Sequence, residues 1–102
     1  VFARELESPF LQTLVGFAQS ELDWIESGKG VEPLEEMERR VRRLHELSTD
    51  MRDVADAWVR YGIASKETGH EQALQDLERA RGFSEKIGAT LLVSRVDQKL
   101  SE

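Results

Sequence analysis

Two series of residues with a spacing of seven run through the middle of the chain and constrain its fold more than any other feature. The first series is Leu34, Val41, Ser48, Ala55 and Gly62, and the second is Met37, Leu44, Met51 and Trp58. Because the series are offset by three and four positions, their side chains lie along one stripe of an α-helix, as in a coiled coil. The pattern predicts a long helix over about residues 33–64, and Pro33 suits its first turn.

A second helical pattern precedes this one. Its apolar residues are Phe10, Phe17 and Trp24, with Leu11, Leu14, Ala18 and Ile25 beside and between them. Ser8 and Pro9 are typical of a helix start, and Gly28 is typical of a helix end. The pattern predicts a helix over about residues 9–27 that turns one apolar stripe toward a core and buries Trp24.

The segment "ETGHEQA", residues 67–73, separates the long helix from a third pattern. Thr68 and Glu71 have the spacing of a capping box, in which each side chain bonds the backbone N–H of the other residue at a helix start. The third pattern consists of Ala73, Leu77, Ala80, Ser84, Ile87, Leu91, Ser94 and Gln98, with Leu74, Phe83, Val96 and Leu100 beside them. It predicts a helix over about residues 69–100.

Three amphipathic helices with short connections predict an all-α fold. A chain of 102 residues is long enough to bury one hydrophobic core. The simplest way to bury three apolar stripes is an antiparallel, up-down-up three-helix coiled-coil bundle. We therefore predict a single helical domain over residues 1–102, with Trp24 and Trp58 in its core.

Composition and charge argue against several classes of protein. The chain has no cysteine, which rules out a disulfide framework and favours a reducing, intracellular setting. Its net charge of −6 disfavours nucleic-acid binding, whose affinity comes largely from neutralising phosphates. It has no signal-peptide pattern and no apolar run of the ~20 residues that a membrane-spanning helix needs. Val1 in place of an initial methionine favours a segment of a longer polypeptide.

Candidate chemistry is limited to one histidine motif. Glu67 and His70 have the Glu-x-x-His spacing of carboxylate-bridged di-iron sites, which need two copies of the motif and further inward glutamates. The chain has one copy, so a role in capping or packing is favoured over a metal site. His45 has no second histidine at metal-ligand spacing and is expected to be partly buried, and no phosphate-binding loop or nucleophile elbow occurs. We predict that the protein is not an enzyme and holds no metal or cofactor.

One cluster of basic residues lies outside the predicted stripe: Arg39, Arg40, Arg42 and Arg43. Three of them follow a glutamate by four residues, in the order that favours helical ion pairs, and the pairs are Glu35–Arg39, Glu36–Arg40 and Glu38–Arg42. The cluster is therefore predicted to be a solvated, salt-bridged face. The alternative is a contact surface for anionic lipid or an acidic partner.

Several short stretches resemble the spectrin repeats of spectrin, α-actinin, dystrophin and plakins. They are "FAQSELDWIES" with the Trp-Ile-Glu of the family's first helix, "RRLHEL" in the second, "ETGHEQA" at the turn into the third, and "SRVDQKLSE" at its end. The likeness covers nearly the whole chain. It implies a cytoplasmic, cytoskeletal scaffold or spacer module that binds neighbouring repeats or other proteins.

Two other helical families are similar in part. The stretches "LEEMERRVRRLH", "VADAWVRYG" and "SEKI" are similar to parts of the BAR coiled coils of sorting nexins. That resemblance implies a peripheral membrane-binding module in endosomal trafficking, although a complete BAR protomer is much longer. A syntaxin-like three-helix domain is a third alternative on shape alone. A non-catalytic scaffold that contacts proteins is the favoured function, and membrane contact is expected only under the BAR-like alternative.

Overall fold

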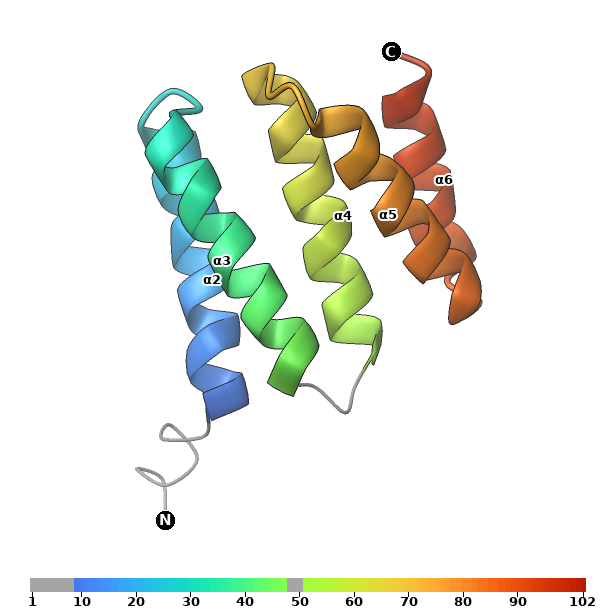
Figure 1. Cartoon of the computed structure of the whole chain (residues 1–102), viewed down its shortest axis with the longest axis horizontal. Helices are drawn as coiled ribbons and strands as arrows, with labels where there is room; N and C mark the ends of the chain where they lie inside the picture. The colour runs from blue at the N-terminus through green and yellow to red at the C-terminus, as the bar shows by residue number, and fades with distance from the viewer. Residues whose placement is uncertain (1–8, 48–50) are drawn as a thin grey trace. The chain divides into compact units, whose positions relative to one another are not determined.

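The computed structural model describes residues 9–47 and 51–102, and within these ranges the chain is all α-helical, as the sequence predicts. Five helices occur there (Figure 1): α2 (Pro9–Glu26), α3 (Val31–Leu47), α4 (Met51–Thr68), α5 (Ala73–Lys86) and α6 (Thr90–Leu100). They form two compact units, one that holds α2 and α3 and one that holds α4 to α6. The prediction of one domain over residues 1–102 stays a prediction.

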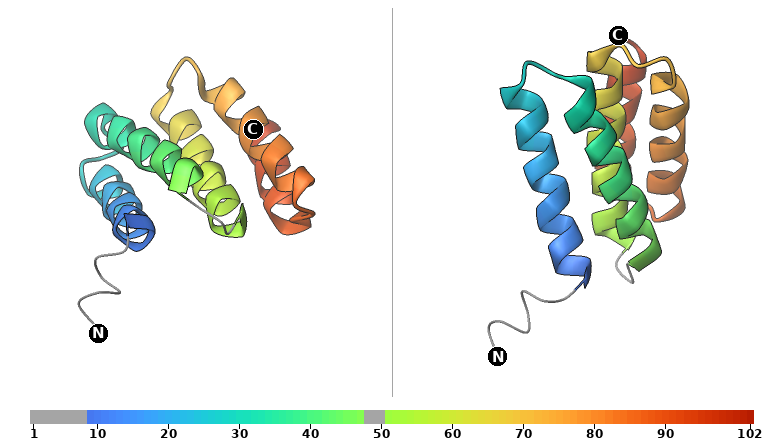
Figure 2. Two further views of the ribbon diagram at one scale, coloured as in Figure 1. Left: turned by 60° about the horizontal axis from the view of Figure 1, so that its bottom comes forward. Right: turned by 60° about the vertical axis from the view of Figure 1, so that its left-hand side comes forward.

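The first unit is a hairpin of two helices that pack along each other; α3 lies in front of α2 in Figure 1, and the right-hand view of Figure 2 shows them side by side. Each helix buries one residue in every turn; these are Thr13, Phe17, Ser20 and Trp24 on α2 and Leu34, Met37, Val41 and Leu44 on α3. The two buried hydroxyls donate to carbonyls one turn earlier, Thr13 to Pro9 at 2.7 Å and Ser20 to Gly16 at 2.8 Å. Neither hydroxyl therefore carries the cost of an unpaired buried polar group.

The second unit is built around α4, which contacts both α5 and α6, while α5 also contacts α6 (Figure 2). α5 lies close to α4 at Gly62, where a Cβ atom would lie 3.1 Å from the Leu77 Cδ2 atom and 3.4 Å from its Cα atom. The missing side chain lets the backbone of α5 lie against α4. The long heptad series thus ends in glycine at the point where another helix crosses it.

A hydrogen bond and a cation–π contact join α4 to α5, and an aromatic pair packs within α4. The buried Ser65 hydroxyl donates to the buried Asp76 carboxylate at 2.9 Å. The Trp58 ring meets Tyr61 edge-to-face, with centroids 6.1 Å apart, and the Arg79 guanidinium lies over the same ring at 5.1 Å. Trp58 is 2% exposed, so its prediction as a core residue is confirmed.

The prediction of a three-helix bundle is wrong, because the described residues contain five helices. The predicted helix 33–64 corresponds to α3 and α4, and residues 48–50, which include the predicted stripe residue Ser48, lie outside the described residues, as does Ser8. The predicted helix 69–100 corresponds to α5 and α6. Gly88, with a φ of 74°, ends α5, because helical hydrogen bonding does not continue through a left-handed residue.

The weak third stripe is divided by this break. Leu77, Ala80 and Ser84 are buried on α5, whereas Leu91, which follows Ser84 in the same seven-residue series, is 81% exposed on α6. A seven-residue spacing holds side chains on one face only within a continuous helix. Beyond Gly88 the seven-residue spacing therefore no longer places side chains on the buried face.

We predict that Trp24→Ala lowers the free energy of unfolding by ~3–5 kcal/mol, because the ring is 5% exposed and its removal leaves a cavity. Val31→Ala, at a 56% exposed position of the same unit, is the matched control and should change it by no more than ~0.5 kcal/mol. Urea unfolding followed by circular dichroism measures both. A loss below ~1 kcal/mol for Trp24→Ala would contradict the burial of this ring.

Candidate functional site

The four arginines predicted as a contact surface, Arg39, Arg40, Arg42 and Arg43, all lie on α3 and all form ion pairs within that helix. Glu36 binds both Arg39 and Arg40, with 2.9 Å between its Oε1 atom and the Arg40 Nε atom. The Arg42 Nη2 atom lies 2.9 Å from the Glu38 Oε2 atom. We call these four residues the arginine cluster.

The pairing differs from the predicted one in two places. The pairs Glu36–Arg40 and Glu38–Arg42 are confirmed. The prediction that Arg39 pairs with Glu35 is wrong, because its guanidinium reaches Glu36, three residues before it. Arg43, for which no partner was predicted, pairs with Glu46 at 3.0 Å.

Electrostatics in the arginine cluster centre on Glu36. The hydrogen bond from Arg39 lowers the pKa of the Glu36 carboxyl, partial burial opposes that shift, and the bond from Arg40 lowers the pKa further. The Arg40 guanidinium also lies against α2, where a Cβ atom at Gly16 would approach its Cζ atom to 2.9 Å. Glycine at position 16 thus leaves room for the Arg40 side chain beside α2.

The Glu67–His70 motif lies at the end of α4. This helix continues through Thr68, whose hydroxyl donates to the Ala64 carbonyl at 2.8 Å, so the predicted capping box with Glu71 is wrong. The backbone N–H groups of Gly69 and His70 bond the carbonyls of Lys66 and Ser65, both at 3.0 Å, which is the Schellman pattern of a helix end.

The side chains of the same motif have structural partners. The His70 Nδ1 atom accepts from the Gln72 backbone N–H at 3.2 Å, and a Glu67 carboxylate oxygen lies 3.7 Å from the Lys99 Nζ atom. Within residues 9–47 and 51–102, no group of three or more His, Cys, Asp or Glu side chains is placed to hold a metal ion. His45 is exposed on α3, contrary to the partial burial expected.

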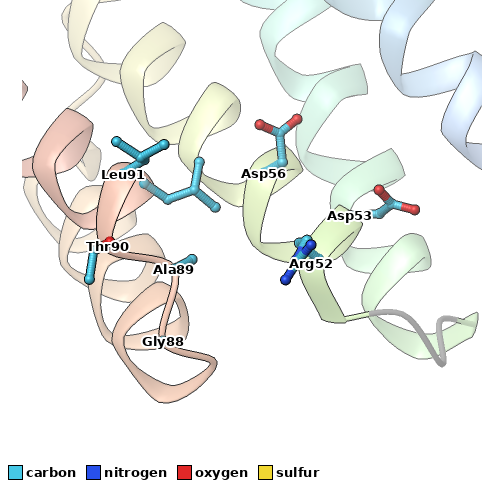
Figure 3. A pocket seen from close by; sticks show the side chains of 8 residues that line it. Arg52, Asp53, Asp56, Gly88, Ala89, Thr90 and Leu91 are labelled. Carbon is cyan, nitrogen blue, oxygen red and sulfur yellow. The ribbon is translucent and has the colours of Figure 1, made fainter.

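An open hollow of about 500 Å³ lies in the second unit, between the start of α4 and the connection from α5 to α6 (Figure 3). Arg52, Asp53 and Asp56 line one side, and residues 88–92 line the other. Asp56 is already engaged, with its Oδ2 atom 2.8 Å from Arg60 and its Oδ1 atom 3.9 Å from Arg95. Asp56 therefore stands in the hollow as a carboxylate that is already paired with two arginines.

The outward side of α2 carries a row of exposed apolar residues that we call the outer face of α2: Leu11, Val15, Ala18, Leu22 and Ile25. The four larger side chains are between 40% and 66% exposed. Their spacing of four, three, four and three is that of a coiled-coil stripe. At 100° per residue this row is centred roughly 130° around the helix from Phe17 and Trp24.

The sequence prediction had placed both rows on one stripe. Leu11, Ala18 and Ile25 were expected in the core beside Phe17 and Trp24, and their exposure contradicts that expectation. Val15 and Leu22 were not assigned to any site. The signal that could have found them was present, because they complete the alternating four-three spacing of a second stripe on the same helix.

No family model, curated protein or solved structure matches this chain. Among the described residues, no helix is long and apolar enough to cross a membrane.

We predict that Gly69→Ala destabilises the protein by ~1 kcal/mol, because Gly69 has a φ of 79° and a Cβ atom disfavours this left-handed conformation. Gly82→Ala is the matched control. Gly82 lies inside α5 with open space around it, so alanine there should stabilise the protein by ~0.5–1 kcal/mol. Urea midpoints measure both changes, and equal signs for the two variants would contradict a helix end at Gly69.

We also predict that Glu36→Gln lowers the urea midpoint at pH 7 more than Glu35→Gln does, since Glu36 holds two arginines. The folded pKa of Glu36 is depressed, so its contribution is present above the ordinary glutamate pKa and is lost as pH falls through the folded value. The difference between the variants should therefore vanish in acid. A larger effect of Glu35→Gln at pH 7 would restore the pairing predicted from sequence.

Proposed function

We propose that this chain is a non-catalytic helical scaffold or spacer module that binds protein partners as part of a longer cytoskeletal or adaptor protein. The observation that carries the proposal is the outer face of α2, an apolar stripe with coiled-coil spacing that is exposed to solvent. The resemblance of short stretches to spectrin repeats supports the same class of function and a cytoplasmic setting.

The spacing of the exposed apolar residues on α2 matters more than the amount of apolar surface that they expose. Single exposed leucines are common on soluble proteins, whereas a contiguous apolar row marks an interaction site. Burying a valine, leucine or isoleucine side chain fully is worth ~1.5–3 kcal/mol. A helix with the complementary stripe would recover part of that free energy from each exposed residue along α2, so a helical protein segment is the partner that suits this face.

The charges on α2 limit which partner helices it can bind well. α2 contains three carboxylates, Glu21, Asp23 and Glu26, and no lysine or arginine. Carboxylates beside an apolar stripe attract basic residues at the flanking positions of a partner helix. The partner that α2 suits best is therefore an amphipathic helix with a leucine-type stripe, whose flanks are basic or uncharged where they lie along the acidic half of α2.

A BAR-like membrane-binding module is the second candidate function. It is favoured by the exposure of the arginine cluster, whose side chains are between 43% and 70% exposed. However, α3 carries five glutamates and four arginines, a formal net charge of −1 with His45 neutral. Attraction to anionic lipid needs an excess of basic residues, so the scaffold function is the better supported of the two.

The test of the proposed function uses two probes, a synthetic helical peptide with a leucine stripe flanked by lysines and anionic lipid vesicles. We expect the chain to bind the peptide, Val15→Glu to abolish that binding because it places a charge in the stripe, and joint replacement of the arginine cluster by glutamine to leave it unchanged. Titration calorimetry measures peptide binding, and vesicle co-sedimentation measures lipid binding.

Each outcome decides between the two functions. Salt-sensitive binding to the vesicles that is lost on replacing the arginine cluster would overturn the scaffold proposal in favour of the membrane-binding one. Absence of peptide binding, or equal binding by Val15→Glu, would also contradict the proposal.

A further inference from the structure

The outer face of α2 is nearly symmetric about its centre. Ala18 is the middle residue, Val15 and Leu22 stand three and four positions from it, and Leu11 and Ile25 stand seven positions away on each side. The chemistry is symmetric as well, since large aliphatic side chains flank one small residue. A stripe of this kind is complementary to its own copy in the opposite direction.

We infer that the outer face of α2 binds the same face of a second copy of this chain, with the two helices antiparallel and crossing at Ala18. This inference rests on the proposed function and identifies the partner. In this arrangement Leu11 lies beside Ile25 of the second copy, and Val15 lies beside Leu22 of the second copy. Ala18 meets its own copy on the two-fold axis, where its small side chain permits close approach of the helices.

The charges on α2 favour the antiparallel direction. All three carboxylates lie in the C-terminal half of the helix, and the N-terminal half, from Pro9 to Ala18, is uncharged. In an antiparallel pair the acidic half of one helix lies along the uncharged half of the other. A parallel pair would bring each carboxylate beside its own copy, which is repulsive.

The helix dipole gives a second reason. α2 has no acidic residue in its first turn and no basic residue in its last turn, so its own charges do not complement its macrodipole. Asp23 and Glu26 stand near the C-terminus, the end where negative charge is unfavourable. Antiparallel pairing moves these carboxylates beside the N-terminus of the second copy, where negative charge is favourable.

The outer face of α2 offers a small contact to a second copy. One stripe of five residues per copy is a small interface, at or below the low end of the ~1,200–2,000 Å² that specific interfaces bury. We therefore expect a weak, reversible dimer whose population depends on protein concentration.

Sedimentation equilibrium of the full chain tests self-association. We expect the average mass to rise with concentration toward that of two chains, and Leu22→Glu to remain monomeric at every concentration. Leu74→Glu is the matched control, because Leu74 is an exposed leucine on α5, outside the outer face of α2. It should associate like the unaltered chain, and circular dichroism should show both variants to be folded.

Cross-linking tests the direction of pairing. The chain has no cysteine, so a single introduced cysteine is unique. Under mild oxidation Ala18→Cys should form a disulfide-linked dimer, whereas Leu11→Cys alone should not. A mixture of Leu11→Cys and Ile25→Cys should give the mixed dimer. Homodimeric cross-linking of Leu11→Cys would indicate a parallel pair and overturn the inference.

The remaining outcomes separate this inference from the proposed function. A chain that is monomeric throughout but binds the lysine-flanked peptide in a manner sensitive to Val15→Glu overturns self-pairing and leaves the scaffold function standing. A chain that is monomeric and binds no peptide overturns both. A dimer that survives Leu22→Glu places the interface elsewhere and overturns the inference.

Discussion

A pair of backbone hydrogen bonds around a left-handed residue ends three of the helices, and the rest of the structure depends on where these ends fall. At Gly28, Gly69 and Gly88 the N–H of the glycine bonds the carbonyl three residues earlier, and the next N–H bonds the carbonyl five residues before it. These two hydrogen bonds satisfy carbonyl groups that a helix end otherwise leaves unpaired. It also sets how long each helix is, and hence which apolar residues share one face.

The lengths of the helices decide which of their faces are covered by other helices of the same unit. α4 contacts two helices of its own unit and buries residues over much of its surface. α2 contacts only α3 within its unit, so its inner row is buried while the outer row stays exposed. The proposed function and the proposed antiparallel pairing both rest on this exposed row with coiled-coil spacing.

Charge in the first unit is distributed between its two helices in different ways. On α3 the arginine cluster is neutralised within the helix, and Glu36 holds two arginines at once, which leaves little net charge to attract a lipid surface. On α2 the carboxylates are gathered in one half of the helix. The neutralised arginine cluster on α3 is typical of a solvated face. The carboxylates at one end of α2 favour an antiparallel direction for the proposed contact between two copies.

Local properties were predictable from the sequence alone. The all-α class followed from apolar spacing, the start of α2 followed from Pro9, and the burial of Trp24 and Trp58 followed from their places in the stripes. The pairs Glu36–Arg40 and Glu38–Arg42 were predictable because both partners lie on one helix at a fixed separation. Each of these depends on residues close together in the chain.

The remaining features are two local details that residue spacing left open and one that tertiary structure decided. Thr68 matched a helix start by its side-chain chemistry, yet it ends α4, because the left-handed Gly69 and its hydrogen bonds outweigh the spacing to Glu71. Arg39 can reach a glutamate three or four residues before it, and in the structure it pairs with Glu36. The sequence by itself determined that α2 has apolar residues on two sides. Only the tertiary structure decided that α3 covers the side of Trp24 and leaves Val15 and Leu22 exposed, because burial is a property of two surfaces and a single helix specifies one.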